Sequence, residues 1–214
     1  GAWTVLGVGG GGPVNGQNYS KKECYIKAIE LNPKRDAAWN CLGMEGGGSV
    51  GGQSYSPKEC YEKVLELNPQ RANAWNCLGL AGGGSVGDQN YSEKECFLKA
   101  LELNPNSDSA WLKLGSGGGG PLGGQNYSPK DCYLKALECK PTNHAAWVCL
   151  GTCGGGSVNN QNYSKRECFV KALELNPMYS AAWQTLGSEG GGLVGGQNYS
   201  PRECYTRVLE HSLG

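Results

Sequence analysis

Residues Asp36 to Arg71 read D-A-A-W-N-C-L-G-M-E-G-G-G-S-V-G-G-Q-S-Y-S-P-K-E-C-Y-E-K-V-L-E-L-N-P-Q-R, and close copies of this segment follow one another along the chain. The only tryptophans mark the repeat at a constant spacing of 36 residues: Trp3, Trp39, Trp75, Trp111, Trp147 and Trp183. A unit this short cannot bury its own apolar face, so its copies must stack. The sequence therefore predicts a mainly α-helical solenoid of six units, one array over residues 1–214.

Charge and composition narrow the classes of partner. The chain has 19 basic and 19 acidic residues, so its formal net charge is zero and we expect no nucleic-acid partner. No apolar run approaches the ~20 residues of a membrane span, and the first residues lack the pattern of a signal peptide. The 36 glycines follow the repeat and alternate with apolar residues, which indicates ordered structure.

Each unit is expected to contain two helices. The first, helix A, covers residues 37–43, where Ala38, Trp39 and Leu42 have helical spacing. The second, helix B, begins at a serine three residues before an acidic residue, the pattern of a capping box. These pairs are Ser20/Glu23, Ser56/Glu59, Ser92/Glu95, Ser128/Asp131, Ser164/Glu167 and Ser200/Glu203. Helix B ends at an Asn-Pro pair, since proline cannot extend a helix.

The core face of helix B is expected at positions i, i+4 and i+7, which are Cys60, Val64 and Leu67, with Tyr61 and Leu65 beside them. This places six periodic cysteines in the core as small apolar side chains: Cys24, Cys60, Cys96, Cys132, Cys168 and Cys204. Two other cysteines, Cys139 and Cys153, replace different residue types in neighbouring units. If these two cysteines do not form a local disulfide, all 11 cysteines are free thiols.

A β-hairpin is predicted between the two helices. The pattern Val-x-x-Gln, or Leu-x-x-Gln at Leu122, encloses two residues that are always Gly, Asn or Asp. These residues tolerate positive φ, as a two-residue hairpin turn requires. We expect one strand to end at Val50 and the next to cover 53–55. The alternative is a glycine-rich coil without fixed shape.

The unit resembles the tetratricopeptide repeat, a helix pair of 34 residues. The matching residues are Trp39, Leu42-Gly43, Tyr55 and the L-E-L-N-P run that ends at Pro69, and the similarity covers all six copies. It implies a superhelical solenoid and a peptide groove lined by helix A. The sequence departs from the family between residues 44 and 54, where glycines and the hairpin pattern replace the rest of helix A. The resemblance therefore supports the fold more strongly than the groove.

No catalytic, cofactor or metal site is expected. The two histidines, His144 and His211, do not recur with the repeat and lie near no metal-binding or nucleophile pattern. Matches to G-x-G-x-x-G, such as residues 7–12, precede a hairpin instead of a helix. The chain is therefore interpreted as non-catalytic.

Five units contain N-Y-S, a sequence that accepts N-linked sugar in the secretory pathway. The acceptors would be Asn18, Asn90, Asn126, Asn162 and Asn198. The simpler explanation is that the serine caps helix B and asparagine suits the end of a strand. Sugars would place the protein outside the cell, whereas reduced thiols would suit the cytoplasm.

The preferred function is that of a structural or scaffold protein that associates with itself. Stacking residues remain at both ends of the array: Trp3 and Leu6, and Cys204, Tyr205, Val208 and Leu209. Either the chain is part of a longer array, or head-to-tail contacts between copies extend it into a filament. The alternative is a peptide-binding adaptor of tetratricopeptide type that uses the exposed side of helix A: Asn40, Asn76, Leu112, Val148 and Gln184. The side-chain type drifts at these positions, which favours the structural role.

Overall fold

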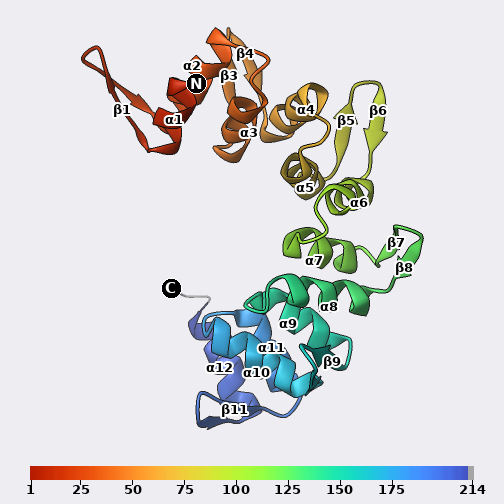
Figure 1. Ribbon diagram of the computed structural model, residues 1–214. Coiled ribbons are helices and arrows are strands. Elements are labelled where there is room, and N and C mark those ends of the chain that lie inside the picture. Colours follow the sequence, from red (N-terminus) through yellow and green to blue (C-terminus); the bar gives the residue numbers. More distant parts are fainter. Residues whose placement is uncertain (212–214) are drawn as a thin grey trace. The chain divides into compact units, whose positions relative to one another are not determined.

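The computed structural model describes residues 1–211, and these form twelve α-helices and six two-stranded antiparallel sheets. Contacts divide the chain into two compact units, Gly1–Pro105 and a second that begins at Asn106. Each unit contains three repeats of helix, hairpin and helix (Figure 1). The predicted order of elements is therefore confirmed in every repeat.

The first unit contains three repeats in chain order. The first is α1 (Ala2–Val8), β1 (Gly11–Val14), β2 (Gln17–Ser20) and α2 (Lys21–Leu31). The second is α3 (Asp36–Met44), β3 (Gly48–Val50), β4 (Gln53–Tyr55) and α4 (Pro57–Leu67). The third is α5 (Ala72–Leu80), β5 (Gly84–Val86), β6 (Gln89–Tyr91) and α6 (Glu93–Leu103).

The second unit repeats the pattern. Its repeats are α7 (Asp108–Ser116), β7 (Gly120–Leu122), β8 (Gln125–Tyr127) and α8 (Pro129–Cys139); α9 (His144–Thr152), β9 (Gly155–Val158), β10 (Gln161–Ser164) and α10 (Lys165–Leu175); and α11 (Ser180–Ser188), β11 (Gly192–Val194), β12 (Gln197–Tyr199) and α12 (Pro201–Glu210). Odd-numbered helices are the A helices, and even-numbered helices are the B helices.

Helix B begins at a capping box in all six repeats. In α4, the amide of Glu59 donates to Ser56 Oγ at 3.2 Å, and the amide of Ser56 donates to Glu59 Oε2 at 2.7 Å. These bonds satisfy amides that the helix itself leaves without partners. Hydrogen bonds from the Ser56 backbone and hydroxyl also hold the pKa of the Glu59 carboxyl below its ordinary value.

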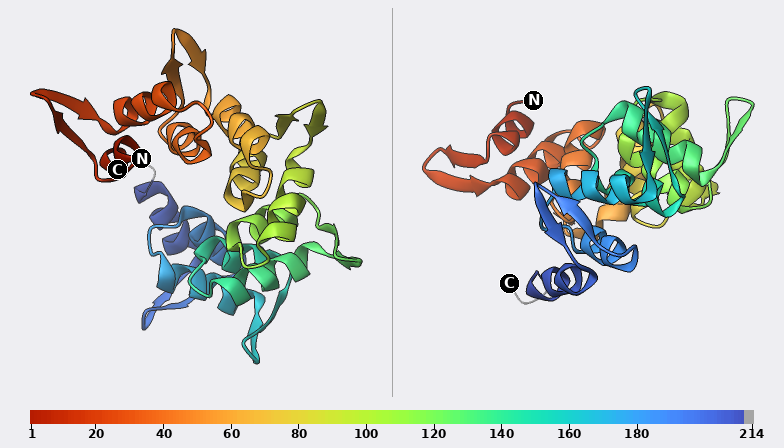
Figure 2. Two further views of the ribbon diagram at one scale, coloured as in Figure 1. Left: turned by 45° about the horizontal axis from the view of Figure 1, so that its top comes forward. Right: turned by 90° about the horizontal axis from the view of Figure 1, so that it is seen from below.

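The hairpins form with the predicted register. Val50 pairs with Gln53, and the two turn residues between them, Gly51 and Gly52, have φ of 57° and 85°. Positive φ at both central residues defines the type I′ turn, whose twist matches that of two paired strands. Asn15 and Asn159 adopt φ of 50° at the equivalent of Gly51. Each hairpin projects beyond the helices of its own repeat (Figure 2).

Four tryptophans lie between their own hairpin and the loop before helix A: Trp39, Trp75, Trp147 and Trp183. Trp75 is 4% exposed, its Nε1 donates to the carbonyl of Pro69 at 2.8 Å, and its ring centroid lies 4.7 Å from that of Tyr91. The same proline contact recurs at Trp39, Trp147 and Trp183. Because the proline belongs to the preceding repeat, the predicted burial of tryptophan between repeats is confirmed at these positions.

The core face of helix B differs from the prediction at one position. Cys60, Val64 and Leu65 are fully buried and Tyr61 is nearly so, but Leu67 is 38% exposed. Leu31 and Leu175, at the same position, are exposed as well. Leu67 ends α4, and the chain turns at Asn68 before helix A of the next repeat begins. The expected i+7 member of the core stripe is therefore wrong.

The glycine of the Leu-Gly pair allows helices A and B to approach closely. A Cβ at Gly79 would lie 2.7 Å from Cε1 of Phe97, whose ring is 1% exposed on α6. The other repeats place a tyrosine or phenylalanine ring against the same glycine, as Tyr61 lies against Gly43. Any side chain at this position would therefore push the two helices apart.

We expect Gly79→Ala to lower the free energy of unfolding by about 1–2 kcal/mol. Alanine favours the helix by about 1 kcal/mol over glycine, but overpacking a closed core costs about 1–3 kcal/mol. Urea unfolding followed by circular dichroism measures the net effect. In a Phe97→Leu background the same substitution should be less harmful, because the ring atoms that it strikes are gone. A Gly79→Ala protein more stable than the parent would contradict this account of the packing.

Candidate functional site

A junction between consecutive repeats recurs within each of the two compact units. Helix B of one repeat packs against helix A and the first strand of the next, as α4 does against α5 and β5 (Figure 1). At this junction the amide of Ser85 donates to Glu62 Oε1 at 2.8 Å. Apolar burial, the tryptophan–proline contact and polar bonds thus all act at one interface.

A polar contact between the two ends of one repeat stabilises this arrangement and was not predicted. Arg71 Nε donates to the Asp36 carboxylate at 2.7 Å, and Asn68 Nδ2 donates to the same oxygen at 3.1 Å. The Arg71 side chain, helped by Asn68, holds the pKa of the Asp36 carboxyl below its ordinary value. The equivalent pairs in the second unit are Asn143 with Asp108 and Asn176 with His144. The Asn of the Asn-Pro pair was the available signal, but it was interpreted only as part of a helix stop.

Helix α12 leaves the same surface open. Tyr205 is 43% exposed and Leu209 is 65% exposed, whereas their equivalents in α8, Tyr133 and Leu137, are 7% and 0% exposed beneath α9. Val208 is half-buried, and Cys204 is fully buried. Of the residues expected to stack at this end, three therefore lie at the surface, and the cysteine lies within the repeat.

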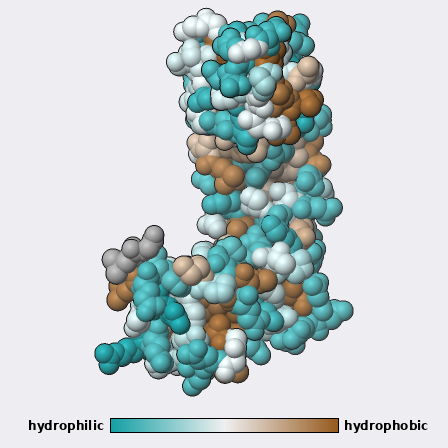
Figure 3. Space-filling view, turned by 90° about the vertical axis from the view of Figure 1, so that its left-hand side faces the viewer, coloured by the Kyte–Doolittle hydropathy of each residue, from teal (hydrophilic) through white to brown (hydrophobic). Residues whose placement is uncertain are grey.

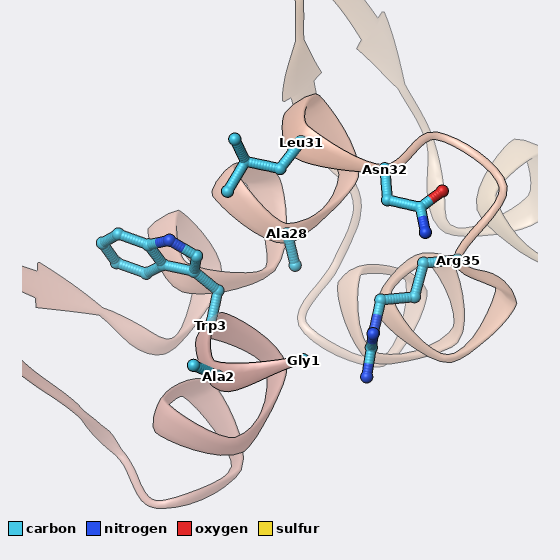
Figure 4. Close-up of a pocket in the computed structure, with 7 residues that line it drawn as sticks. All are labelled: Gly1, Ala2, Trp3, Ala28, Leu31, Asn32 and Arg35. Carbon is cyan, nitrogen blue, oxygen red and sulfur yellow. The ribbon is translucent and has the colours of Figure 1, made fainter.

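The complementary surface is open on α1. Trp3 and Leu6 are half-buried, although their equivalents Trp39 and Leu42 are 4% and 0% exposed. A pocket of about 190 Å³ lies beside Trp3 (Figure 4). It is lined by Gly1, Ala2, Trp3, Ala28, Leu31, Asn32 and Arg35. The indole and Leu31 form one side and Arg35 the other, so the pocket combines an apolar wall with a cation.

Hydrophobic side chains elsewhere on the surface form no single large patch on the face that Figure 3 shows. They lie in small separate groups among hydrophilic residues (Figure 3). Exposed apolar residues on the first unit include Val8, Met44 and Leu80, which occupy one position at the end of helix A. The open faces of α12 and α1 differ from these scattered residues. The same faces of the helices in the other repeats are buried.

The expected peptide-binding side of helix A is partly buried. Asn76 is 9% exposed and Val148 is 7% exposed, and Asn40 and Leu112 are half-buried. Gln184 alone among the five is exposed. The expectation that these positions form an exposed row is therefore wrong for Asn76 and Val148. Helical periodicity separates them from the core stripe of helix A but does not predict their burial.

All eleven cysteines lie in the described residues, and none forms a disulfide. The six periodic cysteines of helix B are fully buried, as predicted. Burial raises the pKa of the Cys60 thiol to about 11 and that of Cys168 to about 12. Since the thiolate is the reactive form, these side chains are unreactive near neutral pH. Their burial explains the periodic cysteine as a core residue.

The proposed link between Cys139 and Cys153 is not supported by the fold. Cys139 ends α8, directly before the short loop to α9, whereas Cys153 follows the last residue of α9. The nine residues of α9 separate the two ends by about 12 Å along the helix axis. A disulfide requires Cα atoms within about 7 Å. The disulfide alternative is therefore wrong, and both cysteines are free.

The five N-Y-S asparagines are all exposed on the second strand of their hairpins. Asn90 Oδ1 accepts a hydrogen bond from Ser85 Oγ across one hairpin at 2.5 Å. The serine of each sequence caps helix B, so its presence has a structural explanation. Sugar attachment at Asn18, Asn126, Asn162 and Asn198, as at Asn90, stays a prediction.

Within residues 1–211, no group of three or more His, Cys, Asp or Glu side chains could hold a metal ion. Across the same residues, none of the helices has the length and apolar character needed to cross a membrane. His144 Nε2 lies 3.3 Å from Asn176 Nδ2, and the imidazole ring packs edge-on to the Tyr179 ring. His144 therefore takes part in a contact between the ends of its repeat.

No protein-family model matches the chain, and no curated protein matches it either. The resemblance to tetratricopeptide repeats therefore depends on the residues themselves and stays a prediction.

Proposed function

We propose that this chain is a non-catalytic scaffold of tetratricopeptide-like repeats that associates head to tail with a second copy of itself. In this proposal the six repeats form a continuous superhelical solenoid. The exposed face of α12, formed by Tyr205, Val208 and Leu209, receives helix A and the first hairpin strand of the other copy. The open surface of α1 is the complementary half of the contact.

The observation that carries the proposal is the contrast between α12 and the covered B helices. In α8 and α10, the equivalents of Tyr205, Val208 and Leu209 are buried beneath the following helix A. A repeat of the same type is therefore the occupant that this face already accepts elsewhere in the chain. Burying a large apolar side chain such as leucine contributes about 1.5–3 kcal/mol, which acts in favour of association.

Substituting both Val208 and Leu209 with Glu tests this contact. Two carboxylates buried without partners would cost several kcal/mol, so the variant should be a folded monomer. The parent chain should increase in mass with concentration in sedimentation velocity. Circular dichroism should be unchanged, because Leu209 is exposed and Val208 half-buried in the isolated chain.

Met44→Glu is the matched control, since Met44 is 65% exposed and lies outside the proposed contact. This variant should associate as the parent does. A parent chain that stays monomeric at high concentration would contradict the proposal and would favour the peptide-binding alternative. Equal association of the parent and of the double variant would also contradict it.

A further inference from the structure

The end of α9 places two thiols one helical turn apart. At the C-terminal end of the helix, the amide of Cys153 donates to the carbonyl of Leu150 at 3.1 Å and to that of Cys149 at 3.3 Å. Side chains at this spacing lie on one face, with Cβ atoms about 5–6 Å apart. Cys149 is half-buried and Cys153 is exposed, so the pair is open to solvent from one side.

A phenol and an ammonium group lie near this pair. Burial raises the pKa of Tyr133 on α8, and the nearby thiols of Cys149 and Cys153 raise it further. Burial also raises the pKa of the Cys149 thiol, against which the positive charge of Lys113 acts. Both sulfurs thus lie near the Tyr133 hydroxyl, and the Lys113 ammonium group acts against negative charge on the Cys149 sulfur.

The pair is specific to one repeat. The same two positions elsewhere are Val5/Gly9, Cys41/Glu45, Cys77/Ala81, Lys113/Gly117 and Thr185/Glu189. The fold of the repeat therefore does not require a second thiol at position 153. The half-buried cysteine recurs at Cys41 and Cys77, where it lacks a thiol four residues later.

We propose that Cys149 and Cys153 form a two-coordinate site for a soft monovalent metal ion, copper(I). Thiolate sulfur is a soft ligand that suits copper(I), as it also suits zinc and iron–sulfur clusters. Binding replaces two S–H bonds with two S–Cu bonds and releases two protons, which leaves the centre with a single negative charge. The positive charge of Lys113 favours the ionised form of the Cys149 thiol.

The spacing favours a bridging ion over a disulfide. Two metal–sulfur bonds of about 2.3 Å, the length found for zinc, allow sulfurs to lie up to about 4.6 Å apart. This suits Cβ atoms about 5–6 Å apart, the separation expected for residues four positions apart at the end of a helix. A disulfide requires a Cβ separation of about 3.8 Å and would distort the end of α9.

Anaerobic titration of the reduced full-length chain with copper(I), in competition with the colorimetric chelator bicinchoninate, tests the site. The parent should withdraw one copper ion per chain from the chelator, and electrospray mass spectrometry should show that ion bound with loss of two protons. Cys153→Ala, which recreates the Cys77/Ala81 pair, should lose this uptake. Cys77→Ser removes a thiol at the same depth as Cys149 and should retain it.

Ala81→Cys transfers the pair to the third repeat and should add a second copper ion per chain. Circular dichroism of each variant confirms that the fold is retained. The proposal is overturned if the parent fails to compete, or if Cys77→Ser loses as much copper as Cys153→Ala. A Cys153→Ala protein that binds copper as tightly as the parent also overturns it.

Discussion

Replacing Trp75 with Ala will lower the free energy of unfolding by about 3–5 kcal/mol, the range for removing a large aromatic side chain from a core. The indole is 4% exposed and contacts both the Tyr91 ring and the carbonyl of Pro69. Its loss leaves a cavity between two repeats and removes the partner of that carbonyl. The effect should therefore extend to the junction as well as to the repeat itself.

Urea unfolding followed by circular dichroism measures this loss. Trp3→Ala is the matched control, because Trp3 contacts Tyr19 in the same way but is only half-buried. Trp3→Ala should lower the free energy of unfolding clearly less than Trp75→Ala does. Equal losses for the two variants would mean that the tryptophan stabilises its own hairpin and contributes little to the junction.

Replacing Gly47 with Ala will lower the free energy of unfolding by about 2–5 kcal/mol, because the substitution combines backbone strain with a steric clash. Gly47 has φ of 72°, and a Cβ there would lie 2.2 Å from the carbonyl oxygen of Tyr55. The struck atom belongs to the backbone directly before Ser56, which caps α4, so it cannot move away without disturbing that helix. Thermal or urea unfolding of the variant measures the loss.

Gly46 provides the control for backbone strain alone. Its φ is 86°, yet nothing lies within 4 Å of a Cβ built on it. Gly46→Ala should therefore cost about 1–2 kcal/mol, the penalty for a left-handed conformation. If the two adjacent glycines respond equally, the close approach at Gly47 is not what determines its identity.

The sequence was sufficient to predict the elements of each repeat. The capping box at Ser56, the turn at Gly51-Gly52 and the buried cysteine at position 60 all follow from local rules about hydrogen bonds, φ angles and helical spacing, and the structure confirms them. These features depend on residues within a few positions of one another. Repetition strengthened each prediction, since the same pattern occurs in six copies.

Features that depend on how elements meet were predicted less well. Leu67 has the spacing of a core residue but lies where the chain leaves helix B. Asn76 and Val148 lie off the core stripe of helix A but are less than a tenth exposed. The contact of Arg71 with Asp36 joins residues 35 positions apart. A single period assigns a residue to an element and a face, but it does not say how far a neighbouring element covers that face.

The hairpin tips have a consequence for how such a protein changes over time. No atom lies within 4 Å of a Cβ built at Gly51 or Gly52, and asparagine already replaces glycine at Asn15 and Asn159. Substitutions by residues that tolerate positive φ, and short insertions at the tip, should therefore have little effect on the free energy of unfolding. Selection for stability should not remove them. The tips offer six separate places where one scaffold could acquire new sequence while its helices and junctions stay the same.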